Sequence, residues 1–354
     1  MDHSDKANTT NQQISKSKYA YMHAKPHFSY LLSAYFNKLI HIRFILGFLY
    51  FLFVSFSHGQ YFSGEITYMT SIIPDKGVEL DTNILNADGM VSKYIITKGN
   101  YKNVYLDSNG QESYSYTYHN GSKRMYDYYI SREYITYRDS RKGKSTNYGT
   151  KVIGDSIVYI LGFPCYQVQR ETDYGLVTTF YSDSIQVDYD SFKEHAVGNW
   201  YEEIRQVGGS ITIKSITKFP TYISIREAIQ IEERKVDKEE FKLPEIPTVA
   251  SVQSLDLRVQ LRPLNKLQIE CYNKSIEKAS KIKGRTTDYT IYLRFVLTES
   301  GETKFIEIYN PDRFGLGEIA MDIMKSCGLT FIPGRIGNVT VASEVFFPIE
   351  FRMN

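Results

Sequence analysis

The residues that could carry out chemistry are few after residue 59 of this chain. After residue 59 only two histidines occur, His119 and His195, and neither has a nearby cysteine or histidine at metal-ligand spacing. Cys165 could serve as a nucleophile with His195 as its base. A buried thiol on a strand that follows Pro164 is the favoured interpretation.

Acidic residues gather at 183–194 but do not have the spacing of a calcium loop. The EF-hand pattern and its glycine are missing, so a solvated loop is favoured over a Ca²⁺ site. The cluster consists of Asp183, Asp188, Asp190 and Glu194. No phosphate-binding loop, G-x-S-x-G, H-E-x-x-H or Cys-x-x-Cys pattern occurs. We therefore predict no catalytic residue, no metal ligand and no cofactor, and a protein that is not an enzyme.

The first 59 residues read as a signal peptide with a long leader. Residues 1–43 are basic, residues 44–56 (FILGFLYFLFVSF) carry no charge, and the small residues Ser57 and Gly59 precede Gln60. Thirteen helical residues would span about 20 Å, short of a hydrocarbon core of about 30 Å. We predict cleavage before Gln60 and a periplasmic or outer-envelope location. The alternative is an uncleaved inner-membrane anchor that extends back through Leu39, and Met22 is a second candidate start.

Charge excludes one class of partner. The chain has 42 Lys+Arg against 40 Asp+Glu, a formal net charge of +2. A nucleic-acid-binding protein needs a basic excess to displace counterions, so we predict no nucleic-acid partner.

Residues 60–226 predict an antiparallel β domain. The chain contains 30 Tyr and 20 Phe, a composition that favours strands. Asn109-Gly110 and Asn120-Gly121 predict hairpin turns, because Asn-Gly tolerates the positive φ of a type I′ turn. Alternating tyrosines between residues 114 and 137 place aromatic rings on one face, where a structural role is favoured over sugar stacking. The expected fold is a curved antiparallel β half-barrel.

A charged segment interrupted by Pro244 and Pro247, within residues 227–263, is expected to be a linker before a mixed domain at 264–354. Apolar spacing predicts helices at 266–282 and 316–327, and strands at 289–298, 303–309 and 339–351. The order of these elements predicts an α+β domain with a three-stranded antiparallel sheet. Cys271 and Cys327 fall in this domain and form a candidate disulfide, while three buried thiols are the alternative.

The C-terminal segment resembles a known family. Its hairpin closes on Ser-Gly-Glu at 300–302, its helix ends in Lys-Ser-Cys at 325–327, and the strand 345–351 reads VFFPIEF. Together with the segment 331–334 (FIPG), these features resemble the C-terminal domain of TonB-type energy transducers over about residues 264–354. The resemblance implies that a peptide of an envelope or outer-membrane protein adds as a strand to the last strand. The matching positions are Val341, Ala342, Ser343, Glu344, Val345, Phe346 and Phe347.

The front domain is similar to the LolA-like half-barrel carriers of lipoproteins in the Gram-negative envelope. The similarity rests on Gly64-Glu65-Ile66 at the start of a strand and on residues 162–165 (GFPC) before another. It implies that a concave apolar face holds a lipid or an acyl chain.

Two functions are compatible with these patterns. The first is a non-enzymatic cell-envelope binding protein whose C-terminal part docks a partner peptide by strand addition. The alternative is a membrane-anchored TonB-type energy transducer that acts on an outer-membrane transporter. N-terminal sequencing of the mature protein separates them, because an anchored transducer would retain residues 44–56.

Overall fold

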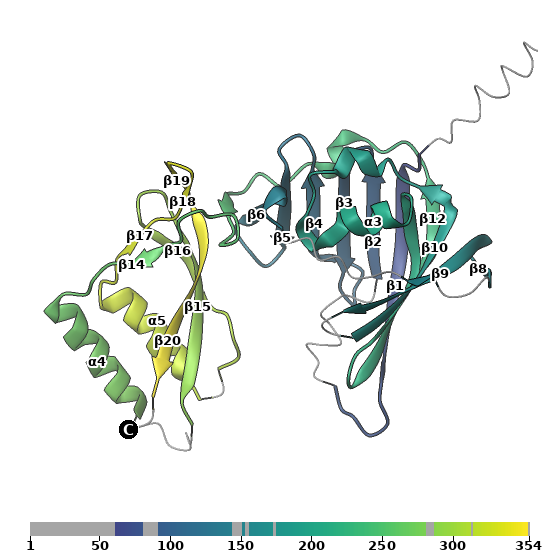
Figure 1. The fold of residues 1–354 in the computed structure, drawn as a ribbon. Helices are drawn as coiled ribbons and strands as arrows, with labels where there is room; N and C mark the ends of the chain where they lie inside the picture. Colours follow the sequence, from purple (N-terminus) through teal and green to yellow (C-terminus); the bar gives the residue numbers. More distant parts are fainter. Residues whose placement is uncertain are drawn as a thin grey trace, which may run out of the picture. The chain divides into compact units, whose positions relative to one another are not determined.

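The computed structural model describes residues 61–80, 91–143, 151–152, 156–172, 175–280, 287–312 and 314–352 (Figure 1). The chain divides into two units, 1–60 and 61–354. The predicted signal segment and its apolar stretch lie outside the described residues, so cleaved signal and retained anchor both stay predictions. In the part of the chain that is described, no helix has the length and apolar character needed to cross a membrane.

One mixed sheet organises the described residues. Its fifteen main strands follow the order β16-β15-β20-β13-β6-β5-β4-β3-β2-β1-β12-β11-β10-β9-β7, and β8 pairs with β9. The strands of the first part are β1 (Gly64–Pro74), β2 (Val91–Thr97), β3 (Asn100–Leu106), β4 (Glu112–His119), β5 (Arg124–Tyr129) and β6 (Ile135–Asp139). They are followed by β7 (Lys151–Val152), β8 (Val158–Ile160), β9 (Phe163–Thr172), β10 (Gly175–Gln186), β11 (Ser210–Lys218) and β12 (Tyr222–Glu233). The last strands of the sheet are β13 (Thr248–Ala250), β15 (Tyr289–Leu297), β16 (Thr303–Ile308) and β20 (Ser343–Phe351).

Two short pairs and a few helices complete the described fold. The pairs are β14 (Gln260–Leu261) with β17 (Phe331–Ile332) and β18 (Arg335–Ile336) with β19 (Val339–Thr340). The α-helices are α3 (Trp200–Gln206), α4 (Lys266–Ser280) and α5 (Leu316–Ser326). The 3-10 helices are η1 (Ser140–Lys142), η2 (Tyr189–Phe192), η3 (Val197–Asn199) and η4 (Lys238–Phe241).

The fold expected from the sequence is wrong. The structure is neither a β half-barrel nor a separate three-stranded α+β domain, because one large mixed sheet without barrel closure joins both regions. Residues 248–250, which the sequence places in a linker, form β13. This strand pairs in parallel with β6 at Val249 and Thr136, and with β20 at Ala250 and Ser343. A three-residue strand carries no readable alternation, so its pairing could not be seen in the sequence.

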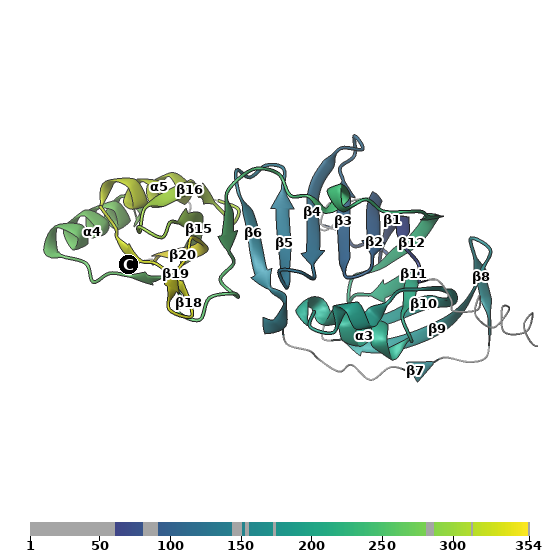
Figure 2. The ribbon, with the colours of Figure 1, turned by 90° about the horizontal axis from the view of Figure 1, so that it is seen from above.

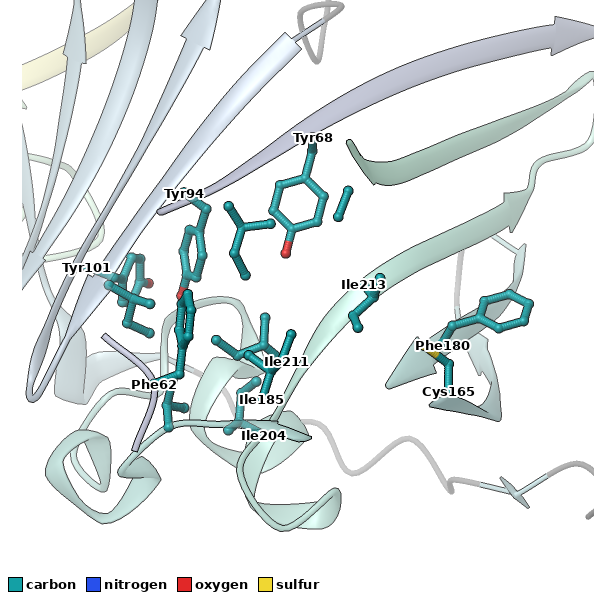
Figure 3. Packing of buried hydrophobic residues seen from close by; sticks show 14 of the residues in the cluster. Phe62, Tyr68, Tyr94, Tyr101, Cys165, Phe180, Ile185, Ile204, Ile211 and Ile213 are labelled. Carbon is teal, nitrogen blue, oxygen red and sulfur yellow. The ribbon is translucent and has the colours of Figure 1, made fainter. Parts of the chain in front are cut away.

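The first part of the sheet bends around α3, as Figure 2 shows. Register shifts between Thr67 and Tyr68 in β1, and between Phe180 and Tyr181 in β10, mark irregularities of the kind that increase strand bending. Inside the bend, Tyr68 and Tyr94 reach from β1 and β2 toward Ile204 of α3 (Figure 3). The concave face is thus lined by aromatic and aliphatic side chains of the chain itself.

A second core lies where α4 and α5 pack on β15, β16 and β20. Every second residue of β15, from Ile291 to Leu297, is fully buried in it. On β20, Ile349 and Phe351 are buried on the same side. Because successive strand residues point to opposite faces, the intervening residues of these strands lie on the face without helices.

Candidate functional site

The hydrogen bonds of β15 show which main-chain groups of the paired strand β20 point away from β15. Tyr292 of β15 donates its N–H to Asn310 Oδ1 (2.7 Å), and its carbonyl accepts from the Tyr309 N–H (2.8 Å). Both groups of Tyr292 therefore point toward β16. Pro348 is the residue directly opposite Tyr292 on β20. In an antiparallel pair whose members do not exchange hydrogen bonds, both main chains point outward, so Pro348 faces away from β15.

The outward side of β20 is only partly covered. Among the described residues, β20 pairs with β15 over its whole length but with β13 only at Ser343. There the Ala250 N–H donates to the Ala342 carbonyl (2.9 Å), and the next residue, Ser251, turns its N–H to the Tyr137 carbonyl of β6 (2.9 Å). The segment that follows Ala250 therefore turns away from β20 after this single paired position.

The uncovered stretch has defined hydrogen-bonding groups. Since main-chain direction alternates along a strand, Phe346 and Glu350 point outward together with Pro348. Phe346 and Glu350 each offer an N–H and a carbonyl, whereas Pro348 offers only a carbonyl. A proline is tolerated at this position because its missing donor faces the edge rather than β15.

A groove of about 320 Å³ begins where β13 ends. It lies between the face of β20 that is turned away from α4 and α5 and the concave face of β4, β5 and β6. The lining residues are Tyr114, Asp127, Tyr129, Arg132, Thr136, Arg138, Ser251, Val252, Gln253, Arg294, Tyr309, Glu344 and Phe346. The open edge of β20 therefore has a hollow beside it that can receive the side chains of an added strand.

Glu344 is one of the charged residues that line this groove. Its side chain is 8% exposed, and its Oε1 accepts from Arg132 Nη1 (3.3 Å) and from the Tyr134 hydroxyl (3.0 Å). Burial raises the pKa of Glu344, and the charges of Arg132 and Arg294 together with the Tyr134 hydroxyl oppose that rise. These contacts connect β20 to the segment between β5 and β6. The carboxylate of Glu344 is therefore occupied by partners within the chain.

The other charges of the groove are also paired. Arg138 Nη2 lies 3.0 Å from Asp127 Oδ2, and the Tyr114 hydroxyl donates to Asp127 Oδ1 (2.6 Å). Arg294 pairs with Glu307 at 2.6 Å. Burial and the neighbouring Asp127 carboxylate raise the pKa of Tyr114, which keeps its hydroxyl protonated. With its charges satisfied internally, the groove is better suited to main-chain and apolar contacts than to a highly charged ligand.

Apolar surface is exposed next to the outward main-chain groups. Phe346 is 37% exposed and Tyr309 is 55% exposed, and their rings meet edge to face with centroids 4.8 Å apart. Large exposed aromatic side chains at a strand edge are a feature of surfaces that bind other chains.

The predicted docking residues are divided by the structure. Val341 and Ala342 precede β20, and Val341 donates its N–H to the Gly334 carbonyl (3.1 Å). Ser343 is fully buried and paired with β13. Val345 and Phe347 pack toward the helices, which leaves the buried Glu344 and the partly exposed Phe346 on the opposite face, where both line the groove. The open edge therefore starts later than the predicted segment and extends past it to Glu350.

The two cysteines of the candidate disulfide are joined in the structure. Cys271 of α4 and Cys327, which follows α5, form a disulfide with their Cα atoms 5.5 Å apart. This bond fixes α4 against α5 on the helical side of β15 and β20, away from the open edge.

The cysteine and histidine that could have formed a nucleophilic pair have other partners. Cys165 is buried, its thiol donates to the Phe163 carbonyl (3.3 Å), and burial raises its pKa. His195 is fully buried, with its Nε2 2.5 Å from the Tyr101 hydroxyl. A thiol with a raised pKa is a poor nucleophile at neutral pH.

The acidic cluster is split among separate partners. Asp183 accepts from Ser210 (2.9 Å), Asp188 pairs with Lys98 (3.1 Å) and Glu194 pairs with Lys123 (2.8 Å). Within the described ranges, no three potential ligands come together in a way that could hold a metal ion.

Sequence reasoning missed most of the groove. Arg132, Arg138 and Arg294 are separated along the chain and lie in no recognisable motif. They meet only because β13 places β6 next to β20. Pro348 was the available signal for the edge itself, because proline in a strand indicates an edge position.

Comparisons with known proteins do not identify a relative. No family model matches the chain, and no curated protein matches it. Among solved structures, the chain is similar to PNGF-II in a P21 crystal form (TM-score 0.34, 8% identity) and in a C2 form (TM-score 0.34, 11% identity). Each match covers 68% of this chain but only 45% and 44% of those chains, less than half of their length. Similarity at this level carries no argument about function.

Proposed function

We propose that this chain is a non-enzymatic binding protein of the cell envelope that docks an extended segment of another envelope protein along β20. The segment would add as a strand beside Phe346, Pro348 and Glu350. The supporting observation is the outward orientation of these main-chain groups, next to a groove that opens where β13 ends. Strand addition draws its affinity from main-chain hydrogen bonds and its selectivity from alternate side-chain contacts.

The groove also favours a particular kind of segment. Arg138 and Arg294 are already paired, so a strongly charged peptide would gain little there. Phe346 and Tyr309 offer aromatic surface to every second side chain of an added strand. We therefore expect segments in which apolar residues alternate with small or polar ones and in which no proline occupies a pairing position.

The test distinguishes the contribution of the main-chain N–H of Phe346 to peptide binding from the contribution of its side chain. Short peptides are selected for binding to the purified protein from a displayed random library, and their affinities are measured for Phe346→Ala and Phe346→Pro. Phe346→Ala keeps the outward N–H, whereas Phe346→Pro removes it without removing a hydrogen bond to β15. We expect Phe346→Pro to bind at least about tenfold more weakly than Phe346→Ala.

A folding comparison accompanies this experiment. The N–H of Val345 faces β15, so Val345→Pro is expected to lower the unfolding temperature clearly, and Phe346→Pro to lower it less. Equal peptide affinities for Phe346→Pro and Phe346→Ala, with both proteins folded, would show that binding does not use the edge.

A further inference from the structure

A second hollow lies inside the bend of the sheet, separate from the groove beside β20. It has a volume of about 150 Å³. Its walls are strongly aromatic and include an arginine and a glutamate. The lining residues are Tyr68, Tyr94, Tyr116, Tyr181, Trp200, Glu203, Ile204, Ile211, Thr212 and Arg226. Figure 3 shows Tyr68 and Tyr94 on one side and Ile204 and Ile211 opposite them.

The negative charge of this cavity is already neutralised. Glu203 lies 3.0 Å from Arg170 Nη1, and Arg170 also donates through Nη2 to the Tyr181 hydroxyl. Burial raises the pKa of Glu203, and the Arg170 charge opposes that rise. Arg170 and Glu203 thus form one internal pair, which leaves the charge of Arg226 to be balanced.

Arg226 has no carboxylate partner among the residues that the structure describes. Its guanidinium lies over the Tyr68 ring at 3.7 Å from the centroid, and its Nη2 donates to Ser92 Oγ (3.3 Å). Its Nε is buried and has no hydrogen-bond partner in the described structure. A guanidinium carries five N–H donors in a fork that matches a carboxylate, and among the described residues Ser92 Oγ is the hydrogen-bond acceptor recorded for them.

Two tyrosine hydroxyls add further donors. Tyr94 Oη accepts from Trp200 Nε1 (3.1 Å), and Tyr116 Oη accepts from Asn103 Nδ2 (3.0 Å). Because each oxygen is already an acceptor, each hydroxyl retains its own proton for donation. Burial also raises the pKa of Tyr94, so its proton is kept at neutral pH. The cavity therefore combines a surplus of donors with one uncompensated positive charge.

We infer that this cavity binds a small organic carboxylate, with its charged end at Arg226 and its apolar or aromatic body against Trp200, Ile204 and Ile211. A carboxylate would supply the missing negative charge and accept from the guanidinium and the hydroxyls. A cavity of about 150 Å³ is the size that admits benzene in an engineered protein core. An acyl chain fits the lining less well than a compact acid does, because hydroxyl and charged groups occupy much of the wall.

The chain contains a single tryptophan, Trp200, which lines the cavity and serves as a built-in probe. Benzoate is titrated into the purified protein while Trp200 fluorescence is followed, and calorimetry provides an independent binding curve. Benzyl alcohol, which has a similar body without charge, and inorganic phosphate, which has charge without the body, are titrated in parallel. We expect saturable binding of benzoate, and binding at least about tenfold weaker for either of the other two compounds.

Variants locate the site. Arg226→Gln is expected to weaken benzoate binding at least about tenfold, while Arg226→Lys retains part of it. Lys214→Gln, which removes a positive charge from the adjacent strand outside the cavity, should leave the affinity unchanged. A folded Arg226→Gln protein that binds benzoate as the unmodified chain does, equal binding of benzyl alcohol, equal binding of phosphate, or no benzoate binding at all would each overturn the proposal. These outcomes do not involve β20, so they stand apart from the strand-addition test.

Discussion

His195 makes the stability of this protein sensitive to acid in a way that one substitution can isolate. The side chain is fully buried, its ring stacks on Tyr118 with centroids 4.1 Å apart, and its Nε2 lies 2.5 Å from the Tyr101 hydroxyl. Burial, aided by the charge of Arg138, lowers the pKa of His195 to about 3. The folded protein therefore holds this imidazole in its neutral form at neutral and mildly acidic pH.

The loss of folding stability that His195 causes at low pH follows from the linkage between protonation and folding. In the unfolded chain a histidine has a pKa of about 6.5, so below that pH the unfolded state binds a proton that the folded state does not. Stability is therefore complete above about pH 6.5 and is lost as the pH falls toward the folded pKa of about 3. At about 1.4 kcal/mol for each pH unit, His195 alone accounts for a loss of about 3 kcal/mol between neutral pH and about pH 4.5.

The assay compares urea unfolding of the unmodified protein and His195→Gln at about pH 7.5 and about pH 4.5. Glutamine keeps an acceptor for Tyr101 but does not titrate. Between the two pH values, the free energy of unfolding should fall by about 3 kcal/mol less in His195→Gln than in the unmodified protein. The difference isolates His195, because the two proteins share all other titrating groups. Identical pH dependence in the two proteins would refute the assignment of a buried neutral imidazole.

Further predictions concern the two sides of β20. Replacing both Cys271 and Cys327 by alanine should lower the free energy of unfolding by up to about 4 kcal/mol, because their disulfide closes a loop with a sequence separation of 56. Urea unfolding of this variant and of the oxidised protein measures the difference. Glu344→Ala should cost about 3 kcal/mol, because it leaves Arg132 largely buried without its partner. The double variant with Arg132→Ala should lose less than the sum of the two single changes in a thermodynamic cycle, and simple additivity would argue against the contact.

Local patterns predicted individual elements well, but they did not reveal how the strands join. The spacing of apolar residues predicted helices near those observed as α4 and α5, and the Asn-Gly turns at Asn109 and Asn120 fall between strands that are paired in the structure. The division into two sheets was wrong because β13 is too short to show a period, and its flanking Pro247 suggested a linker. Strand pairing at long sequence separation leaves no local signal.

The candidate sites were foreseen unevenly for the same reason. The family resemblance led to an expected docking edge at residues 341–347, and this remains a prediction, while the covering of Ser343 by Ala250 depends on the unforeseen β13. Arg226 looks like an ordinary strand residue in the sequence, and its lack of a carboxylate partner appears only when the neighbouring strands and α3 are in place.

Hydrogen exchange at single residues tests the central claim about β20 most directly. In the free protein the amides of Val345 and Phe347, which face β15, should exchange slowly, whereas those of Phe346 and Glu350 should exchange quickly. Adding a selected peptide should protect Phe346 and Glu350. Slow exchange of Phe346 in the free protein, or no added protection at Phe346 and Glu350 when the peptide is bound, would contradict the account.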